Sequence, residues 1–239
     1  MHSYVYHAQV LDLESADAVR FRLDLGFRVY ADQWLSLADR PDGLRAGDAV
    51  HLIVSEQMDG RILARVYNSA RDGWPPHLWR YPGSLIRVID GDTLDVRVTI
   101  YPGLAIEERF RLARINAPEM HGRRRDDPEY IRGVAARDYA VARLAEHDGQ
   151  TTLHTSRRGK WRRWLAEVYV GDATTPLSDE LLRERLAALW IREPRRPLRT
   201  NGAPLVVSPE LRDRIVSNAD RLHLPPEELL ERALTRYLE

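Results

Sequence analysis

The chain has 239 residues, of which 44% are hydrophobic and 30% are charged, so it can form one large or two small packed domains and is not disordered throughout. It contains no cysteine, which excludes a disulfide framework, a cysteine-ligated metal site and a thiol nucleophile. A run of about 18 apolar residues, which a membrane-spanning helix needs, does not occur. The N-terminal segment lacks the basic region and apolar stretch of a secretory signal, so we expect a cytoplasmic protein without membrane contact.

The formal net charge of zero hides an uneven distribution along the chain. Residues 1–78 contain 8 basic and 11 acidic residues, a balance of −3. Residues 79–199 contain 23 and 18, a balance of +5, and residues 200–239 contain 5 and 7, a balance of −2. We therefore expect a polyanion to bind the middle of the chain.

Two segments, 6–42 and 81–119, show the same landmarks in the same order. Each begins with a tyrosine and continues through an alternating strand-like run to an acidic turn, ESADA in the first and IDGDT in the second. A second alternating run follows. Each segment then ends in an aspartate or asparagine, a proline one or two positions later, and an acidic residue, as ADRPD in the first and INAPE in the second. The simplest interpretation is two tandem, homologous β-rich units.

The second unit is predicted to contain five strands, which suit a small closed barrel of the OB type. A segment of helical periodicity, 127–147, separates the third strand from the fourth and has no counterpart in the first unit. A second helix is predicted over 178–189, where leucines form an apolar stripe. The predicted strands are 84–90, 93–100, 107–115, 151–156 and 163–170.

Four polar elements fall at the predicted strand ends of this unit: the turn 90–93 (DGDT), Arg111, the segment 116–119 (NAPE) and Arg163. Each alone has an ordinary interpretation as a hairpin or proline turn or as an exposed basic residue. Together they supply oxygen ligands for a hard cation, two guanidinium groups and one carboxylate base. That set is what the attack of water on a phosphodiester requires.

The segments VIDGDT, FRLARINAPE, KWRRWLAEVY and ELLRERLA, in this order and at this spacing, resemble the staphylococcal nuclease (thermonuclease) family. The resemblance covers about Tyr81 to Trp190. It implies a five-stranded OB-like barrel with three helices. It also implies a calcium-dependent nuclease that cleaves DNA and RNA with little sequence preference.

The resemblance implies a calcium site formed by Asp92, Asn116 and the backbone carbonyl of Ala117. The sequence departs from the family at Asn116, where the family has aspartate, and an amide in place of a carboxylate weakens a calcium site. It also departs at Arg162, where the family usually has glycine.

The resemblance implies that Glu119 takes a proton from the attacking water, and that Arg111 and Arg163 bind the phosphate and stabilise its developing charge. The expected products carry 3′-phosphate ends.

The first unit matches the same pattern with losses, so we interpret it as a degenerate, non-catalytic barrel that packs against the second. Ala18 aligns with Thr93, and Trp34 stands where Arg111 stands. The other alignments are Asp17 with Asp92, Asp39 with Asn116, Asp42 with Glu119 and Arg61 with Arg163.

The C-terminal part changes character after a linker rich in proline and arginine, 193–203. A short apolar strand, 205–207, precedes two segments of helical periodicity, the first with Ser208 as a predicted N-cap. Residues 204–239 resemble the ribbon-helix-helix family, which implies a homodimer. Because the segment is acidic and its strand has few polar side chains, dimerisation is favoured over sequence-specific DNA reading. A helical hairpin packed on the barrels is the third interpretation.

The predicted fold is α+β and mostly β: two tandem OB-like five-stranded barrels, the second with added helices, and a small ribbon-helix-helix-like β-α-α tail. The predicted domains are the degenerate barrel (1–78), the nuclease-like domain (79–192), the linker (193–203) and the tail (204–239). The predicted function is that of a calcium-dependent phosphodiesterase acting on DNA, RNA or both. The alternatives are a catalytically weakened nucleic-acid-binding protein and a dimeric scaffold.

Overall fold

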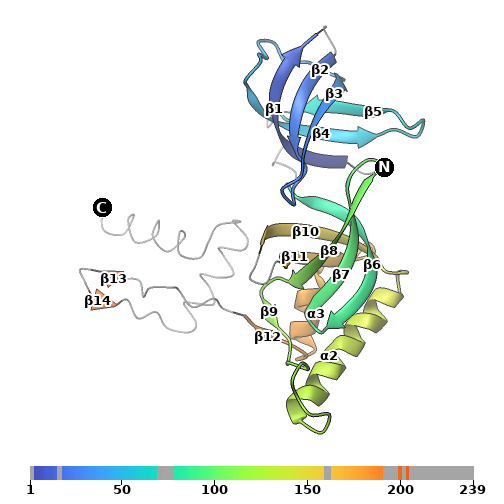
Figure 1. Cartoon of the computed structure of the whole chain (residues 1–239), viewed down its shortest axis with the longest axis vertical. Helices are drawn as coiled ribbons and strands as arrows, with labels where there is room; N and C mark the ends of the chain where they lie inside the picture. Colours follow the sequence, from blue (N-terminus) through green and yellow to red (C-terminus); the bar gives the residue numbers. More distant parts are fainter. Residues whose placement is uncertain are drawn as a thin grey trace. The chain divides into compact units, whose positions relative to one another are not determined.

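The computed structural model describes residues 3–14, 18–68, 71, 78–158 and 163–190, and the backbone of 199–200 and 203–204; the side chains of 156–158 lie outside this description. These residues form two closed five-stranded β-barrels and the helices α2 and α3 (Figure 1). A mostly β fold with two OB-like barrels is thereby confirmed. Among the described residues, no helix combines the length and apolar character needed to cross a membrane.

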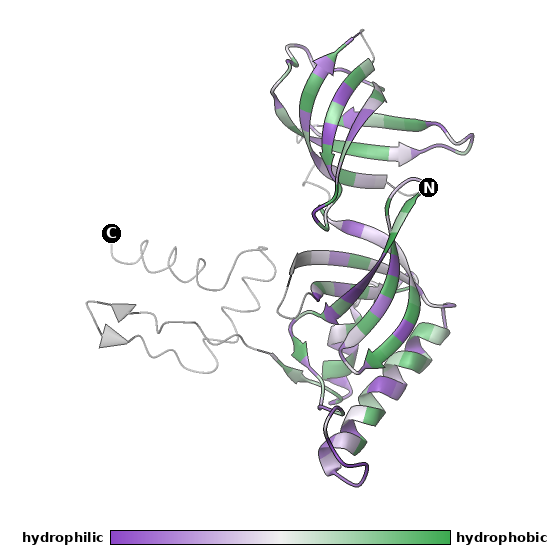
Figure 2. Ribbon diagram, viewed as in Figure 1, coloured by the Kyte–Doolittle hydropathy of each residue, from purple (hydrophilic) through white to green (hydrophobic). Residues whose placement is uncertain are grey.

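The first barrel closes in the order β1-β2-β3-β5-β4, with β3 and β5 parallel and the other neighbours antiparallel. Buried and exposed positions alternate along β2, where Val19, Phe21 and Leu23 are fully buried. Hydrophobic and hydrophilic residues follow one another along strands of both barrels (Figure 2). The strands are β1 (Ser3–Leu13), β2 (Ala18–Asp24), β3 (Tyr30–Leu37), β4 (Ala49–Glu56) and β5 (Ile62–Val66).

The second barrel repeats this topology, closing in the order β10-β11-β8-β7-β6, with β8 and β11 parallel. Its third strand ends earlier than predicted, because Arg114 adopts φ 65° and turns the chain before residues 115–116 form a separate strand, β9 (Ile115–Asn116). The barrel strands are β6 (Arg80–Asp90), β7 (Thr93–Tyr101), β8 (Leu104–Leu112), β10 (Gln150–Arg158) and β11 (Trp164–Val170).

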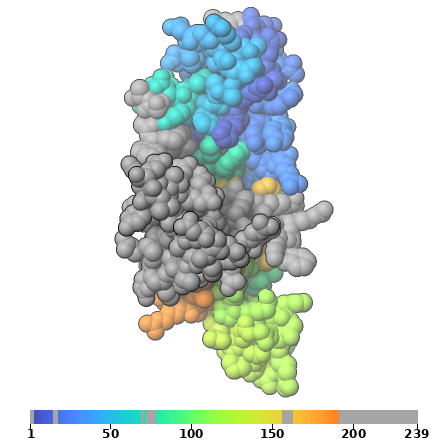
Figure 3. Space-filling model, turned by 90° about the vertical axis from the view of Figure 1, so that its left-hand side faces the viewer, coloured from blue at the N-terminus to red at the C-terminus, as the bar shows by residue number. Residues whose placement is uncertain are grey.

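Helix α2 (Pro128–Ala145) forms where helical periodicity predicted it, and the Asp127 side chain caps it by accepting from the Glu129 N–H at 2.8 Å. Its buried face differs from the one that apolar residues at helical spacing predict, which is Ile131, Val134, Ala135, Tyr139 and Ala142. The larger residue Ile131 is 56% exposed, while the residues that face the barrel are mostly small: Gly133, Ala136, Ala140 and Leu144. Small residues allow the helix backbone to approach the barrel closely. In the space-filling view, α2 with the loop before it forms the yellow-green lobe (Figure 3).

Helix α3 (Leu177–Arg183) ends six residues before the predicted position. Arg185 adopts φ 60°, and the Leu186 N–H donates to Leu181 O at 2.9 Å, which is the pattern of a Schellman C-cap. The residues that follow leave the helix and form β12 (Ala188–Leu189), which pairs antiparallel with β9. The prediction of a helix over 178–189 is therefore wrong for its second half.

The two barrels exchange a reciprocal pair of hydrogen bonds. Tyr6 in β1 donates from its hydroxyl to Ile100 O at 2.7 Å, and Tyr81 in β6 donates to Leu25 O at 2.8 Å. Tyr6 and Tyr81 occupy equivalent positions, because each pairs with a leucine of the fourth strand of its barrel. The two acceptor residues are equivalent as well. Leu25 follows Leu23 by two residues and Ile100 follows Val98 by two residues, and Leu23 and Val98 occupy the same register position in their barrels. The contact is therefore pseudo-symmetric.

Residues from Trp190 onwards form a separate compact unit. In it, β13 (Arg199–Thr200) pairs antiparallel with β14 (Ala203–Pro204). The predicted apolar strand 205–207 and both predicted helices of the tail lie outside the described residues.

Candidate active site

Asp92 lies in the tight turn between β6 and β7 and is only 3% exposed. The turn is stabilised locally, because the Asp92 N–H donates to Asp90 Oδ1 at 3.1 Å and the Thr93 hydroxyl donates to Asp92 Oδ1 at 3.0 Å. The Asp-Gly sequence thus forms the turn of a hairpin, as its ordinary interpretation predicts. The same turn contains Asp92, the predicted metal ligand. A carboxylate this deeply buried needs polar partners.

Arg111 supplies that partner from β8, where it lies directly opposite Thr93. Its Nη1 donates to Asp92 Oδ1 at 2.9 Å and its Nη2 lies 2.8 Å from Asp92 Oδ2, so the pair is bidentate. The same Nη2 donates to Asn116 Oδ1 at 2.6 Å. One guanidinium group therefore joins two of the predicted cation ligands.

Asn116 and Ala117 reach this point because β9 is held from two sides. Ala188 of β12 pairs with Asn116, and the Ala117 N–H donates to Asp92 Oδ2 at 3.0 Å. The turn before β9 is fixed by Arg114, which binds Glu167 Oε1 at 2.6 Å. The structure thus brings Asp92, Asn116 and Ala117 together, as the motif spacing predicts.

Arg163 directly precedes β11, whose first residue pairs in parallel with Phe110 of β8. Its Nη1 donates to Thr93 Oγ1 at 3.4 Å, so it approaches the same turn as Arg111. Its Nε is buried and has no hydrogen-bond partner in the described part of the chain. Arg162, where the sequence departs from the family pattern, lies outside the described residues.

Glu119 behaves differently from the other predicted site residues. It is exposed, and its Oε1 accepts from the His121 N–H at 2.9 Å within its own loop. Across the described ranges, no hydrogen bond or ion pair joins Glu119 to Asp92, Arg111 or Arg163.

The loop that carries Glu119 is held by α2. A Cβ added at Gly133 would lie 2.6 Å from Met120 Cγ and 2.7 Å from Pro118 O, so only glycine permits this approach. Glycine in the helical run RGVAAR is the sequence signal that could have identified this contact.

Burial raises the pKa of Asp92 to about 6, although the Arg111 guanidinium and the Ala117 N–H act in the opposite direction and Asp90 adds to the increase. The carboxylate is therefore ionised at neutral pH and protonated in mild acid. Because burial penalises the charged form, Asp92 depends on a cation at this position.

Asp92 and Asn116 offer the carboxylate and amide oxygens that a hard divalent cation takes as ligands. Asp92 Oδ2 and Asn116 Oδ1 lie 2.8 Å and 2.6 Å from Arg111 Nη2, so they are at most 5.4 Å apart. Two oxygens bound to one calcium ion at about 2.4 Å lie at most about 4.8 Å apart, so the chemistry of the two residues, rather than their separation here, is what fits the ion. No group of three or more histidine, aspartate or glutamate side chains able to hold a metal ion occurs among the residues described.

In the first barrel, the strand register corrects one sequence alignment. Ser36, not Trp34, is the counterpart of Arg111, because Ser36 lies opposite Ala18 as Arg111 lies opposite Thr93. Trp34 lies opposite Arg20 and corresponds to Arg109.

The other aligned residues of the first barrel make local contacts. Arg61 Nε donates to Asp59 Oδ2 at 2.6 Å within its own turn, and Asp39 Oδ2 accepts from Arg71 at 2.8 Å. Asp42 is exposed, and Asp17 lies outside the described residues.

Thr93 belongs to the candidate site by its contacts, although the sequence pattern gave it no separate role. Its hydroxyl donates to Asp92 and accepts from Arg163, so it joins the metal-ligand side of the site to the second arginine. The sequence does contain an indication of this contribution, because Thr93 is the last residue of the DGDT turn.

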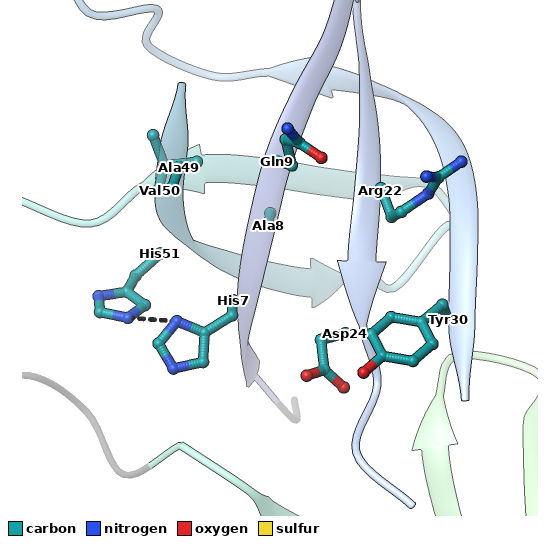
Figure 4. Close-up of a pocket in the computed structure, with 9 residues that line it drawn as sticks. All are labelled: His7, Ala8, Gln9, Arg22, Asp24, Tyr30, Ala49, Val50 and His51. Atoms are coloured by element: carbon teal, nitrogen blue, oxygen red, sulfur yellow. Dashed lines mark hydrogen bonds between the residues drawn. The ribbon is translucent and has the colours of Figure 1, made fainter. Parts of the chain in front are cut away.

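A second polar cluster lines an open cavity of about 480 Å³ on the first barrel (Figure 4). His7 Nδ1 and His51 Nε2 lie 2.8 Å apart across β1 and β4, and Asp24 of β2 lies opposite His7. Desolvation, followed by the nearby His7, lowers the pKa of His51. The sequence reasoning gave these histidines no role.

Neither the models of known protein families nor the sequences of curated proteins match this chain.

Proposed function

We propose that the second barrel carries a calcium-dependent phosphodiesterase site that hydrolyses DNA, RNA or both with low sequence specificity. The observation that supports this most strongly is the approach of two guanidinium groups, Arg111 and Arg163, to the single turn formed by Asp92 and Thr93. Asp92 can neutralise only one of them. A second cation held close to the first, with a buried Nε that lacks a partner in the described residues, favours an anionic ligand such as a phosphate.

The roles of the residues follow from their chemistry. Arg111 and Arg163 hold the non-bridging oxygens of the phosphate and stabilise the charge that develops in the pentacoordinate transition state. Asp92, Asn116 and the Ala117 carbonyl would hold the calcium ion, which would supply Lewis-acid stabilisation of that charge. Arg111 must release the Asp92 and Asn116 oxygens before they can bind a cation, and this release frees its guanidinium for the phosphate.

Glu119 acts as the general base toward the attacking water. For this role its side chain must rotate away from the His121 N–H, where Oε1 now accepts. Catalytic hydrogen bonds often form only in the substrate complex, and an exposed glutamate can rotate at little cost. Attack in line with the 5′ oxygen leaves 3′-phosphate ends.

A nucleic-acid-binding protein with weakened catalysis is the second candidate, and one observation favours it. Asn116 contributes no charge, so the oxygen ligands carry only the single negative charge of Asp92, and Arg111 neutralises that charge in the structure. In that case the chain binds nucleic acid in a salt-sensitive manner without cleaving it. A dimeric scaffold built through 204–239 is the third candidate, and light scattering on the full chain, with no binding to nucleic acid, would identify it.

The test is incubation of the full chain with single-stranded and double-stranded DNA and RNA in calcium, magnesium or a chelator. Glu119→Gln and Arg163→Ala are expected to lower the cleavage rate at least about 10²-fold. Glu107→Gln on β8 and Arg97→Ala on β7 are the matched controls, since both residues are exposed, and they should cleave like the unmodified chain. Cleavage that persists in both site variants, or in the chelator, refutes the proposal.

A further inference from the structure

The turn between β2 and β3 of the first barrel buries an aromatic side chain in the second barrel. Phe27 is only 9% exposed. Its ring lies 5.0 Å from the Trp164 ring, 5.3 Å from the Tyr81 ring and 5.9 Å from the Phe110 ring, measured between centroids. All three neighbours belong to the second barrel, and the contacts with Phe110 and Trp164 are edge-to-face, an arrangement that aromatic pairs prefer.

The backbone of this turn is unusual. Phe27 and Arg28 adopt φ 55° and 64°, in the left-handed region that side chains other than glycine rarely occupy. The turn is also tied to the second barrel, because Leu25 O accepts from the Tyr81 hydroxyl. A Cβ at Gly26, which has φ 75°, would lie 2.4 Å from that hydroxyl oxygen. Such a conformation persists only where the surroundings determine it, and it directs Phe27 into the neighbouring barrel.

The residues that Phe27 contacts are the immediate neighbours of the two site arginines. Phe110 precedes Arg111 in β8, and Trp164 follows Arg163 at the start of β11. Phe110 and Trp164 are also direct partners in the parallel pairing of these strands. Successive residues of a strand point to opposite faces, so the aromatic pair packs inward where the arginines point toward the site.

We propose that Phe27 is a positioning residue for Arg111 and Arg163, and that the first barrel therefore completes the phosphate-binding arginine pair of the second. This inference rests on the proposed function for its catalytic consequence. The packing of Phe27 fixes the separation of the strand ends from which the two guanidinium groups extend. The first barrel thus contributes to the site without contacting the substrate, although its own aligned residues form no such site among those described.

The activity test compares Phe27→Ala, Phe27→Leu and Phe21→Leu in the full chain. A displacement of about 1 Å in positioned groups can cost about 10²-fold, so Phe27→Ala is expected to lower kcat by that factor while KM changes less than about threefold. Phe27→Leu, which keeps apolar volume, should recover most of the rate. Phe21 is fully buried within the first barrel, so Phe21→Leu is the matched control. Equal losses in Phe21→Leu and Phe27→Ala overturn the proposal.

Hydrogen–deuterium exchange gives a second measurement that needs no nuclease activity. In Phe27→Ala and Phe27→Leu, exchange should increase in 110–113 and 164–166, more in the alanine variant, while 18–24 stays as in the unmodified chain. Unchanged exchange in the two β8 and β11 segments overturns the positioning role, whether or not the chain cleaves nucleic acid. Absence of cleavage by the unmodified chain refutes the proposed function instead, so the two failures are distinguishable.

Discussion

Replacing Arg111 by methionine removes the positive charge beside Asp92 while keeping the length of the side chain. In the native chain Asp92 has a pKa of about 6, because burial outweighs the effect of Arg111. Without the guanidinium, burial alone can raise a carboxyl pKa by up to about 3–5 units. Asp92 in Arg111→Met therefore stays protonated at neutral pH, and the charge of Arg111 stabilises the fold only where the native Asp92 is ionised.

The size of this effect follows from the pKa and 1.36 kcal/mol per unit. For a native pKa of about 6, the loss in free energy of unfolding due to the charge is small at pH 6 and grows by about 1 kcal/mol per pH unit between pH 6 and pH 8. The folded variant binds one proton more than the folded native chain where the native Asp92 is ionised. The stability of the variant relative to the native chain therefore falls as pH rises. Lost packing and the lost Asn116 hydrogen bond add a constant that does not vary with pH.

Urea denaturation in a chelator at pH 6, 7 and 8 measures the difference between the two chains. Histidines and other titrating groups are common to both chains, so their contributions cancel. In a chain that also carries Asp92→Asn, the pH dependence of the Arg111→Met effect should vanish. A difference that does not change between pH 6 and pH 8, or a pH dependence that persists in the Asp92→Asn background, would refute this account of the pair.

Three further predictions concern stability. Asp127→Ala removes the α2 N-cap and should lower the free energy of unfolding by about 1 kcal/mol in urea denaturation, while Asp126→Ala, in the exposed loop beside it, should not. Gly133→Val should cost about 1–3 kcal/mol in the same measurement, because its side chain would meet the 118–120 loop, whereas Ala135→Val on the exposed side of α2 should cost little. The lowered pKa of His51 means that folding favours its neutral form, so stability should fall as pH drops below about 6.5. His51→Phe should flatten that part of the pH profile of thermal unfolding, and an unchanged profile contradicts this assignment.

The barrels were predictable because their signals are local. Alternation with period 2 marks the strands, and the Asp-Gly turn marks the β6–β7 hairpin. Asp127 followed by Pro128 marks the start of α2. These patterns report which segments form strands and helices. They do not report which face of α2 packs, because close approach selects small residues such as Gly133 over larger ones such as Ile131.

The ends of elements escaped prediction for a related reason. Arg114 and Arg185 both adopt positive φ, where glycine would be the expected signal, so neither the end of β8 nor the end of α3 is visible in the sequence. The pairing of β12 with β9 joins segments more than seventy residues apart, and no local pattern encodes it. The order of sequence motifs alone aligned Trp34 with Arg111. The β2–β3 register, which the sequence does not reveal, shows that Ser36 is the residue that corresponds to Arg111.

The site itself was predictable as a set of residue types at fixed spacing, and Asp92, Arg111, Asn116 and Ala117 do meet. The hydrogen bonds from Arg111 to the oxygens of Asp92 and Asn116 were not predicted, because the spacing of motifs in the sequence does not show which charged groups pair. The contribution of Thr93 was also missed.

The reciprocal bonds of Tyr6 and Tyr81 give the fused barrels the geometry of an isologous homodimer within one polypeptide. A separate dimer encoded by one gene carries every substitution twice, so both halves gain or lose residues together. Fusion removes that constraint, and it also replaces a concentration-dependent association by an intramolecular one. The two halves can then change independently, and the difference between Ser36 and Arg111 at equivalent register positions is of the kind that fusion permits.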